Sequence, residues 1–485
     1  MASKIIFFFL WSFLNILTAE SPYMAGALAI IEHIIVLFYL FSGDLYRSFR
    51  YYILFSTVSF EISTFVLGGS SSSFYSFFSV PVFASIFYLL ELSIMYVKLN
   101  NYATIKNVSY KNHYLSNLSK YLNVIIITGI LAGGVSFLTN DNGTLYSGYY
   151  PGVFVLEIIG FFSKFALFQI AIVFVVKYEK MQDLKKFCHL LLIGLAFACV
   201  LGGIIGKKGY YGEEITMLSP LSMALTPCLL FLCDFKKKDP LNYWTMAAFL
   251  ASVVSSFFYP SVAGSKWYLF ILFTVVSVFC KTFNLKMGVG LILSLTLIPT
   301  IAVFALDHWG RDTYIGFKMN QALGMLNIFG AESIDMWYNG MGNSALFRFD
   351  EIHNVIIEYF NKPYFALLGK GFGGTTLQYT DILSWQTAEG AFSADQIKMH
   401  CYYAMHGPIP QITLRHGLLG LFFLLYYSYV LLKNTQISSW SFCGFLFLFF
   451  FLYWGNSLTI GCIAMVVALH EIDISNLKLK KAKFR

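Results

Sequence analysis

Long apolar runs recur from one end of this chain to the other, separated by short polar segments. A helix needs roughly 20 apolar residues to cross the hydrocarbon core of a bilayer. Hydrophobic residues make up 58% of the sequence and charged residues 12%, whereas soluble domains carry about 25% charged residues. The sequence therefore predicts an all-α polytopic membrane protein and excludes a water-soluble globule.

The apolar runs predict about 14 transmembrane helices, or about 12 if the short runs at either end do not span. The predicted spans are residues 5–19, 24–42, 51–69, 75–97, 122–139, 152–176, 186–205, 216–234, 241–260, 266–283, 287–306, 412–432, 439–454 and 457–470. The first run lacks an A-x-A cleavage motif and is closely followed by another span. We therefore interpret it as a retained helix and not as a signal peptide.

Lysine and arginine fall mainly in every second loop, which predicts the orientation of the chain. Short cytoplasmic loops carry an excess of these residues. The basic loops contain Arg47 and Arg50, residues 98–120, 177–186 and 236–238, Lys281 and Lys286, and the tail KLKLKKAKFR. This pattern predicts that both termini lie in the cytoplasm, and a net charge of +8 placed in such loops implies no nucleic-acid partner.

One external segment is much longer than the others and divides the predicted domains. These are helices 1–11 in residues 1–306, a large external loop at 307–411, helices 12–14 in residues 412–470, and a basic cytoplasmic tail at 471–485. Long loops in compact proteins usually carry function. This one is too rich in Trp, Phe, Ile and Leu for a disordered tether, so we expect an ordered, partly helical cap packed on the membrane domain.

Two stretches of the large loop have recognisable local patterns. In FRFDEIHNVIIEYF, the residues Ile352, Val355, Ile356 and Phe360 recur at helical spacing, and the following NKP predicts the end of that helix. GKGFGG, at residues 369–374, lacks the order of a phosphate-binding P-loop. We interpret it as a turn.

Several basic residues lie beside helix ends on the predicted external side, where the charge rule makes them rare. They are Lys207, Lys208, Lys266, Arg348 and Arg415. Each alone could reach the membrane interface or pair with a nearby acid. Together they suggest a basic site for an anionic ligand, because guanidinium and ammonium groups suit phosphate oxygens.

The same side carries His400, His406 and His416, which could exchange protons near neutral pH. Their spacings match no common metal motif, so we expect no metal or other cofactor. A single histidine in a loop is more often structural than catalytic.

Acidic residues inside the apolar runs suggest a competing class of function. They are Glu32, beside His33, and then Glu61, Glu91 and Glu157, with Lys164 seven residues after Glu157. Glu157 and Lys164 could pair with each other or across helices. Because charge inside a membrane usually serves function, a transporter or lipid flippase remains an alternative.

The sequence MHGPIPQITLRHGLLGL resembles the hallmark of bacterial O-antigen polymerases and O-antigen ligases, a histidine before a helix with a Gly-Leu-Leu-Gly-Leu-like stretch. His406 lies eleven residues before Gly417, as the family pattern expects. Upstream, RFDEIHNVIIEYFNKPYFALLGKGFGG resembles the family's arginine–helix–Pro–Gly-x-Gly element and aligns Arg348 with its large-loop arginine. The resemblance extends over roughly residues 200–432.

Two further elements of the family are similar but altered. AGSKWYLFILF resembles its Ser-Arg-Gly helix start, with Lys266 where arginine is usual, and KKGYYGEEITMLSPLSMAL resembles its basic–Gly–Pro element, with Lys207 or Lys208 as the basic residue. Lysine keeps the charge but loses the bidentate fork of arginine. Gly407 and Pro408 replace the polar residues that commonly follow the family's histidine.

The resemblance implies a membrane glycosyltransferase that uses an undecaprenyl-diphosphate-linked oligosaccharide on the outer face of the bacterial cytoplasmic (inner) membrane, without a metal ion. His406 and Arg348 would be catalytic, and Lys207, Lys208, Lys266, Arg415 and His400 would bind the diphosphate or glycan. A polymerase of O-antigen, capsule or exopolysaccharide is our first expectation, with a chain-length regulator protein as a possible partner. An O-antigen ligase acting on lipid A-core is the nearest alternative, and a flippase for the same lipid a further one.

Overall fold

The computed structural model describes residues 1–18, 22–58, 80–102, 113–138, 149–205, 222–234, 238–258, 343–379, 396, 400–402, 405, 408–451 and 459–483. Its helices are α1 (Ala2–Thr18), α2 (Pro22–Phe41), α3 (Leu45–Val58), α6 (Val80–Tyr102), α7 (His113–Leu138), α8 (Tyr149–Ile172), the π-helical turn η4 (Val173–Lys177), α9 (Met181–Ile204), α10 (Ser222–Leu232), α11 (Pro240–Phe258), α17 (Asn343–Asn361), the 3₁₀ turn η6 (Pro363–Phe365), α19 (Pro408–Lys433), α20 (Trp440–Phe451) and α21 (Thr459–Lys483). A two-stranded antiparallel ladder joins β1 (Thr376–Leu377) to β2 (Cys401–Tyr402).

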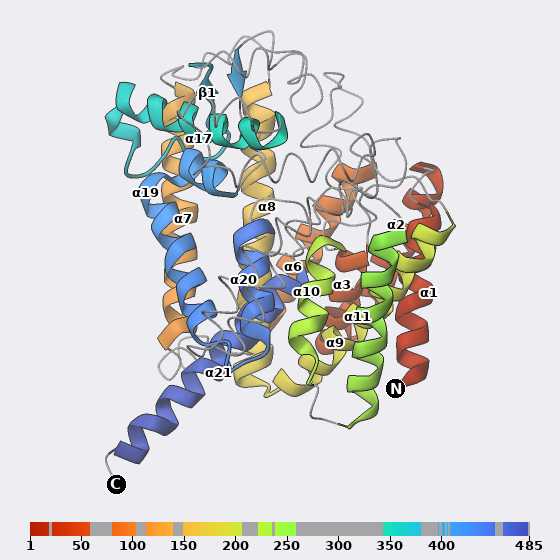
Figure 1. Cartoon of the computed structure of the whole chain (residues 1–485). Coiled ribbons are helices and arrows are strands. Elements are labelled where there is room, and N and C mark those ends of the chain that lie inside the picture. Colours follow the sequence, from red (N-terminus) through yellow and green to blue (C-terminus); the bar gives the residue numbers. More distant parts are fainter. Residues whose placement is uncertain are drawn as a thin grey trace, which may run out of the picture.

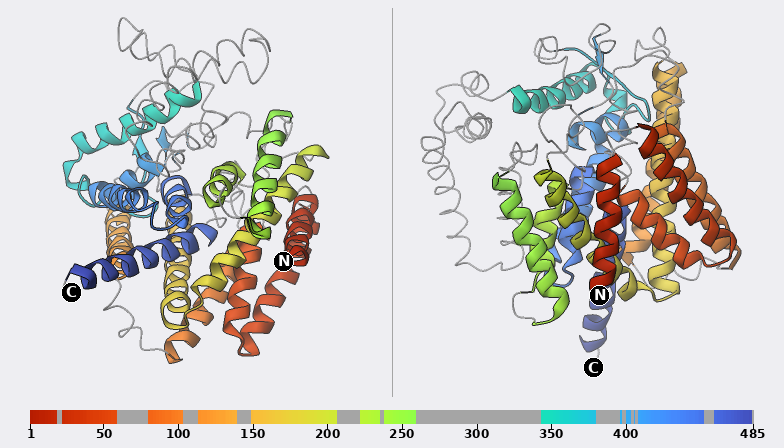
Figure 2. Two further views of the ribbon diagram at one scale, coloured as in Figure 1. Left: turned by 60° about the horizontal axis from the view of Figure 1, so that its bottom comes forward. Right: turned by 90° about the vertical axis from the view of Figure 1, so that its right-hand side faces the viewer.

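The described helices form a bundle in which both termini lie at one end, while α17 and the β1–β2 ladder lie at the other (Figures 1 and 2). Five described helices are long and apolar enough to cross a membrane: His113–Leu138, Glu157–Lys177, Met181–Ile204, Ile409–Lys433 and Thr459–Lys478. Two shorter apolar helices cover Ala2–Thr18 and Gly26–Phe41. The chain is therefore a predominantly helical membrane protein.

Apolar side chains also cover the outside of the bundle. On α7, Ile127, Leu131 and Val135 are 58%, 64% and 54% exposed, at four-residue spacing along one face. Soluble monomers rarely expose continuous apolar patches of this kind. These faces are suited to contact with lipid chains.

The predicted spans between residues 5 and 260 each overlap a described helix, as do those that start at 412, 439 and 457. The overlap is smallest for the predicted span 51–69: α3 begins earlier, at Leu45, and residues 59–69 lie outside the described residues. The predicted spans at 266–283 and 287–306 lie outside the described residues. The predicted boundary between the last span and a basic tail, at residue 470, does not match a helix end, because α21 continues to Lys483. Glu471 is part of the bundle and lies 2.6 Å from Lys185 of α9.

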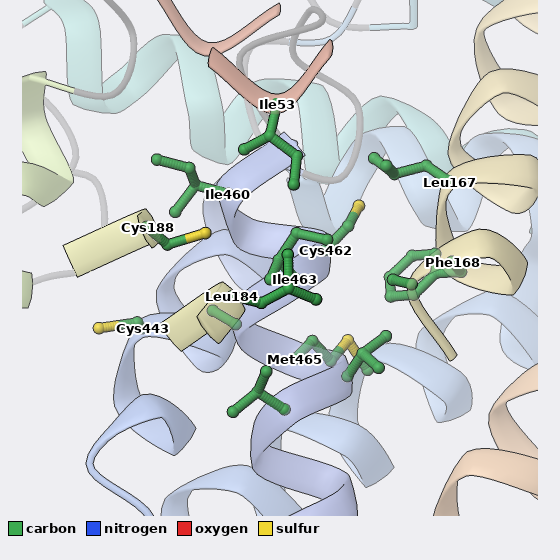
Figure 3. Close-up of a cluster of buried hydrophobic side chains, with 14 of the residues drawn as sticks. Ile53, Leu167, Phe168, Leu184, Cys188, Cys443, Ile460, Cys462, Ile463 and Met465 are labelled. Atoms are coloured by element: carbon green, nitrogen blue, oxygen red, sulfur yellow. The ribbon is translucent and has the colours of Figure 1, made fainter. Parts of the chain in front are cut away.

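The first three turns of α21 form the centre of the bundle. Residues 459–469 are all buried, as expected for a helix that is surrounded by others. Figure 3 shows side chains of α21, including Ile463 and Met465, among residues from α3, α8, α9 and α20. This core holds α8 in place, and α8 carries one of the site residues described below.

Helix α17 lies across the end of the bundle opposite the two termini and not along it (Figures 1 and 2). It ends at Asn361 and is followed by a 3₁₀ turn that starts at Pro363, so the NKP stop is confirmed. The face that packs inward, however, is not the apolar face that the periodicity marks. Asp350, Glu351, Asn354 and Glu358 are fully buried together with Val355, whereas Ile356 and Phe360 are 44% and 81% exposed.

Candidate functional site

The candidate site is built around a break in α19. Gly417 has φ 57° and ψ −150°, which splits the helix and interrupts its internal hydrogen bonds. The segment Ala366–Gly371 fills the break: Leu418 N donates to Ala366 O at 2.9 Å and Leu419 N to Leu367 O at 3.1 Å. Backbone groups inside a membrane protein need such partners, because lipid offers none.

Hydrogen bonds in the opposite direction complete the junction. Lys370 N donates to Leu414 O and Gly371 N donates to Arg415 O, each at 2.9 Å. GKGFGG, which the sequence predicts to be a turn, therefore belongs to a loop inserted into the break of α19. Gly369, Gly371 and Gly373 all have positive φ there, a backbone conformation that residues other than glycine rarely adopt.

The inserted loop also contacts α7, where glycine is needed for close approach. Phe372 N donates to Gly129 O at 3.0 Å. A Cβ atom added to Gly371 would lie 1.9 Å from Gly133 N, and one added to Gly133 would lie 2.6 Å from Phe372 O. The loop backbone can reach α7 only because both positions lack a side chain.

A buried ion pair joins the loop to α8. Arg415 is fully buried, and its Nε and Nη2 atoms lie 2.9 Å and 2.5 Å from Glu157 Oε1. The other carboxylate oxygen of Glu157 accepts a hydrogen bond from Gly373 N at 2.6 Å, and Arg415 Nη1 donates to Gly374 O. The pair therefore connects α8, α19 and the inserted loop.

The sequence did not indicate that Arg415 and Glu157 would be partners of each other. The prediction that Glu157 pairs with Lys164 or across helices is resolved in favour of a partner on another helix, Arg415. The guanidinium of Arg415 is buried and committed to Glu157 and Gly374. These contacts give Arg415 a role in holding the fold together, and its predicted contact with an anionic ligand stays a prediction.

The same carboxylate is linked to the chain just before His406. Gln411 Nε2 lies 3.5 Å from Glu157 Oε1, and Gln411 Oε1 accepts a hydrogen bond from Met405 N at 2.8 Å. Met405 is buried and directly precedes His406 in the sequence. The backbone at position 405 is thus two hydrogen bonds away from Glu157.

A second buried charge cluster lies between α17 and the inserted loop. Lys370 and Glu358 are both fully buried and form an ion pair. Glu358 also accepts hydrogen bonds from Tyr379 Oη at 2.6 Å and Leu377 N at 3.3 Å, and Lys362 Nζ lies 3.2 Å from it. Lys370 thereby ties the loop to the polar face of α17.

The pKa values in this cluster follow from burial and charge. Burial alone would raise the pKa of Glu358, but the ammonium group of Lys370, the hydrogen bonds from Lys370 and Tyr379 and the charge of Lys362 together hold it below its usual value. Burial raises the pKa of Tyr379 to about 12, and its hydrogen bond to Glu358 acts in the same direction. Glu358 is therefore a carboxylate and Tyr379 a neutral donor at neutral pH.

The structure places two of the three predicted histidines in different environments. His416 is fully buried, with the rings of Phe372 and Phe161 at 5.3 Å and 5.8 Å. His400 is exposed, and its Nδ1 lies 2.6 Å from Gln378 Oε1 on the neighbouring segment. Within the ranges that the structure describes, no three His, Cys, Asp or Glu side chains gather as a metal site would require.

Among the remaining predicted site residues, Arg348 belongs to α17, and nothing is described of its side chain. His406, Lys207, Lys208 and Lys266 lie outside the described residues. The predicted basic site for an anionic ligand therefore stays a prediction.

Two residues of the second cluster were not anticipated from the sequence. Lys370 lies within GKGFGG, for which the sequence predicts only a turn, and Glu358 lies on a helix that the apolar residues alone predict. A usable signal was present, because Asp350, Asn354 and Glu358 recur every fourth residue and so share one helix face.

Comparisons with known proteins do not add to this picture: no family model, no curated protein and no solved structure matches the chain.

Proposed function

We propose that this protein is a membrane glycosyltransferase that polymerises oligosaccharide repeat units carried on undecaprenyl diphosphate, at the outer face of the bacterial inner membrane. The proposal rests on the ordered sequence resemblance to O-antigen polymerases and ligases. One structural observation supports it most directly. The two segments with the clearest resemblance, within 343–374 and 408–433, are joined by backbone hydrogen bonds at the break of α19.

This junction connects the parts of the chain that carry Arg348 and precede His406. Arg348 belongs to the helix that Lys370 ties to the loop, and the backbone next to His406 is linked through Gln411 to the Glu157–Arg415 pair. Groups held on one rigid scaffold can act on one substrate, because catalysis requires fixed geometry.

A membrane-surface location for the chemistry is supported by an apolar edge formed by the last turn of α17 and the segment that follows it. Phe360, Tyr364 and Leu367 are 81%, 69% and 63% exposed. Leu367 accepts the hydrogen bond from Leu419, next to Leu418, which is 54% exposed on the outer face of α19. The apolar edge thus continues the lipid-facing surface of α19, and α17 would lie at headgroup depth, where the diphosphate of a lipid carrier also lies.

In the proposed reaction, a sugar hydroxyl of the acceptor attacks the anomeric carbon of the donor glycan. The bond from that carbon to the diphosphate oxygen breaks, and undecaprenyl diphosphate leaves with the electron pair. His406 would take the proton of the hydroxyl. Arg348, with Lys207, Lys208 and Lys266, would stabilise the negative charge that develops on the diphosphate. Arg415 would act as a positioning residue.

The test uses the purified full chain in liposomes with a synthetic undecaprenyl-diphosphate-linked repeat unit, and products are separated by electrophoresis. We expect a ladder of polymer lengths, absent with His406→Ala. A single-repeat product with no ladder contradicts a polymerase. If the unit is instead transferred to added lipid A-core, the protein is a ligase.

The flippase alternative is separated by a second readout in the same liposomes. A flippase moves the intact lipid-linked unit across the bilayer and leaves its length unchanged, so a fluorescent unit would lose its accessibility to an external quencher without any change in size. That result, without a ladder, would overturn the proposed glycosyltransferase.

A further inference from the structure

The N-terminal helices contain a buried polar cluster that the proposed glycan chemistry does not use. Glu32 and His33 on α2 and Glu91 on α6 are 1%, 6% and 0% exposed. His33 Nδ1 lies 2.8 Å from Glu91 Oε1. Glu32 interacts electrostatically with both His33 and Glu91, so two carboxylates and one imidazole lie near one another among apolar helices.

A second pair of contacts ties the cluster to α1. Trp11 Nε1 donates to Glu32 Oε1 at 2.6 Å, and Asn15 Nδ2 donates to the same oxygen at 3.1 Å. Both donors are neutral, so they stabilise the Glu32 carboxyl group without balancing its charge. The cluster thus spans three helices but contains no permanent positive charge of its own.

The cluster lies at the middle of each helix. Glu32 is near the centre of Pro22–Phe41, Glu91 is at the centre of Val80–Tyr102, and Trp11 is in the middle of Ala2–Thr18. At 1.5 Å per residue, Glu32 and Glu91 lie about 15 Å from the ends of their helices, which is half the thickness of the hydrocarbon core, and Trp11 lies about 10 to 14 Å from the ends of α1. If these helices span the membrane, the cluster lies at mid-depth.

Two polar atoms of the cluster lack a hydrogen-bond partner among the described residues: His33 Nε2 and Glu91 Oε2. Leaving such atoms unsatisfied in an apolar interior is costly. A purely structural ion pair would be expected to satisfy them. Because His33 and Glu91 each have a buried polar atom without a hydrogen-bond partner among the described residues, the pair instead points to a site that takes up a ligand.

The charge balance identifies the ligand. Without added protons, the two carboxylates give the cluster a charge of about −2, which is very unfavourable in an apolar environment. One proton on His33 produces an ion pair with Glu91 and leaves about −1, and a second proton on a carboxylate makes the cluster neutral. A metal cation would prefer more oxygen ligands than this set offers.

The packed helices contribute few other ionisable groups. Tyr52 of α3 is buried and interacts electrostatically with Glu91. The first turns of α3 also carry Arg47 and Arg50. Helix α6 itself places Tyr88 against His33, with ring centroids 4.6 Å apart. Helix α8 carries Lys164 and Glu157, the latter held by Arg415, and α1 carries Lys4 near its start.

We propose that Glu32, His33 and Glu91 form a proton-binding site at mid-membrane depth, which gains and loses a proton as the surrounding pH changes. This inference does not depend on the proposed glycan chemistry. Proton binding at this site would change the charge against which α1, α2 and α6 pack.

The test is infrared spectroscopy of the purified full chain in lipid nanodiscs, between about pH 5 and about pH 8, where histidine ordinarily titrates. We expect a protonated-carboxyl carbonyl band whose intensity changes with pH in the wild type. It should be lost or shifted in Glu32→Gln or Glu91→Gln and changed in its pH midpoint in His33→Gln. Asp44→Asn, which alters an exposed carboxylate at the start of α3, is the matched control and should leave the band unchanged.

The wild-type measurement alone can overturn the proposal, so it does not depend on whether any variant folds. No pH-dependent carboxyl band in the wild type would mean that the cluster is a fixed ion pair. A band that persists unchanged in both folded glutamine variants would assign the proton to another carboxyl group and would equally reject the site.

Discussion

The guanidinium group of Arg415 lies 2.5 Å from the carboxylate of Glu157, although 258 positions separate the two residues in the chain. The contact joins α19 to α8 at the point where the loop of residues 369–374 enters the bundle. Because Arg415 is fully buried and Glu157 nearly so, this pair has a large influence on whether the site assembles.

Breaking the Glu157–Arg415 pair from one side should be strongly destabilising. Glu157→Leu or Arg415→Leu leaves one buried charge without its partner, which costs about 3 to 5 kcal/mol. The double variant should lose much less than the sum, since neither charge remains. Denaturant unfolding in detergent gives the stability of the purified wild type, the two single variants and the double variant, which together form a double-mutant cycle. Additive single effects would show that the two side chains do not interact.

Close contact between α7 and the inserted loop predicts different effects for two adjacent glycines. Gly133→Ala should destabilise the protein by about 1 to 3 kcal/mol, because its Cβ would meet Phe372 O at 2.6 Å. Gly134→Ala meets nothing within 4 Å and should be neutral or stabilising by up to about 1 kcal/mol. Both substitutions replace glycine with alanine within α7, so they change helix propensity equally. A difference between the two variants in thermal unfolding therefore reports the contact with the loop. Equal effects would argue against the close approach of the loop to α7.

The environment of Glu358 predicts a loss of stability in acid. Its pKa in the folded protein is below the ordinary glutamate value of about 4.3, so the carboxylate contributes stability above that pH. This contribution disappears as the pH falls through the lower folded pKa and Glu358 is protonated. Unfolding at about pH 6 and about pH 3 should differ more in the wild type than in Glu358→Gln. The control Asp44→Asn should retain the full acid dependence of the wild type.

Arg348 tests the predicted stabilisation of the leaving group. Arg348→Ala should abolish polymer formation while leaving the protein in the membrane, because a contact made in the transition state is worth several kcal/mol, about 3 in comparable sites. Arg348→Lys keeps the charge and should retain part of the activity. His353→Ala changes an exposed side chain on the same helix and serves as the control. Normal polymer from Arg348→Ala at matched protein levels would reject this role.

His406 tests the predicted acid–base chemistry. His406→Ala should stop glycan transfer but still bind the lipid-linked donor, as measured by native mass spectrometry in nanodiscs. In the wild type, activity should fall at acid pH, because a protonated imidazole cannot accept the hydroxyl proton. EDTA should have no effect. Transfer that requires an added divalent ion would contradict the metal-free mechanism, and unchanged transfer by His406→Ala would contradict the role of the histidine.

Local patterns in the sequence located most of the described helices. Hydropathy predicted α8, α9 and α19 close to their observed ends, and Pro363 marked the end of α17. These features depend on neighbouring residues only, since length, apolar content and helix-stopping residues are read along the chain.

The orientation of α17 could not be obtained in the same way. Its apolar residues predicted which residues share a face, but the buried face contains Asp350, Asn354 and Glu358. A polar face can turn inward only when partners are present there, and Lys370 and Tyr379 supply them. In a membrane protein, the opposite apolar face loses little by remaining exposed, because lipid can cover it.

The sequence by itself thus determined a helical membrane protein, the positions of most described helices and the ionisable residues within and beside them. Only the tertiary structure decided which charges meet: Arg415 with Glu157, Lys370 with Glu358, and His33 with Glu91. The physical reason is that burial strengthens the attraction between opposite charges a few ångströms apart, whatever their separation along the chain. That proximity depends on how the helices pack, which no local pattern records.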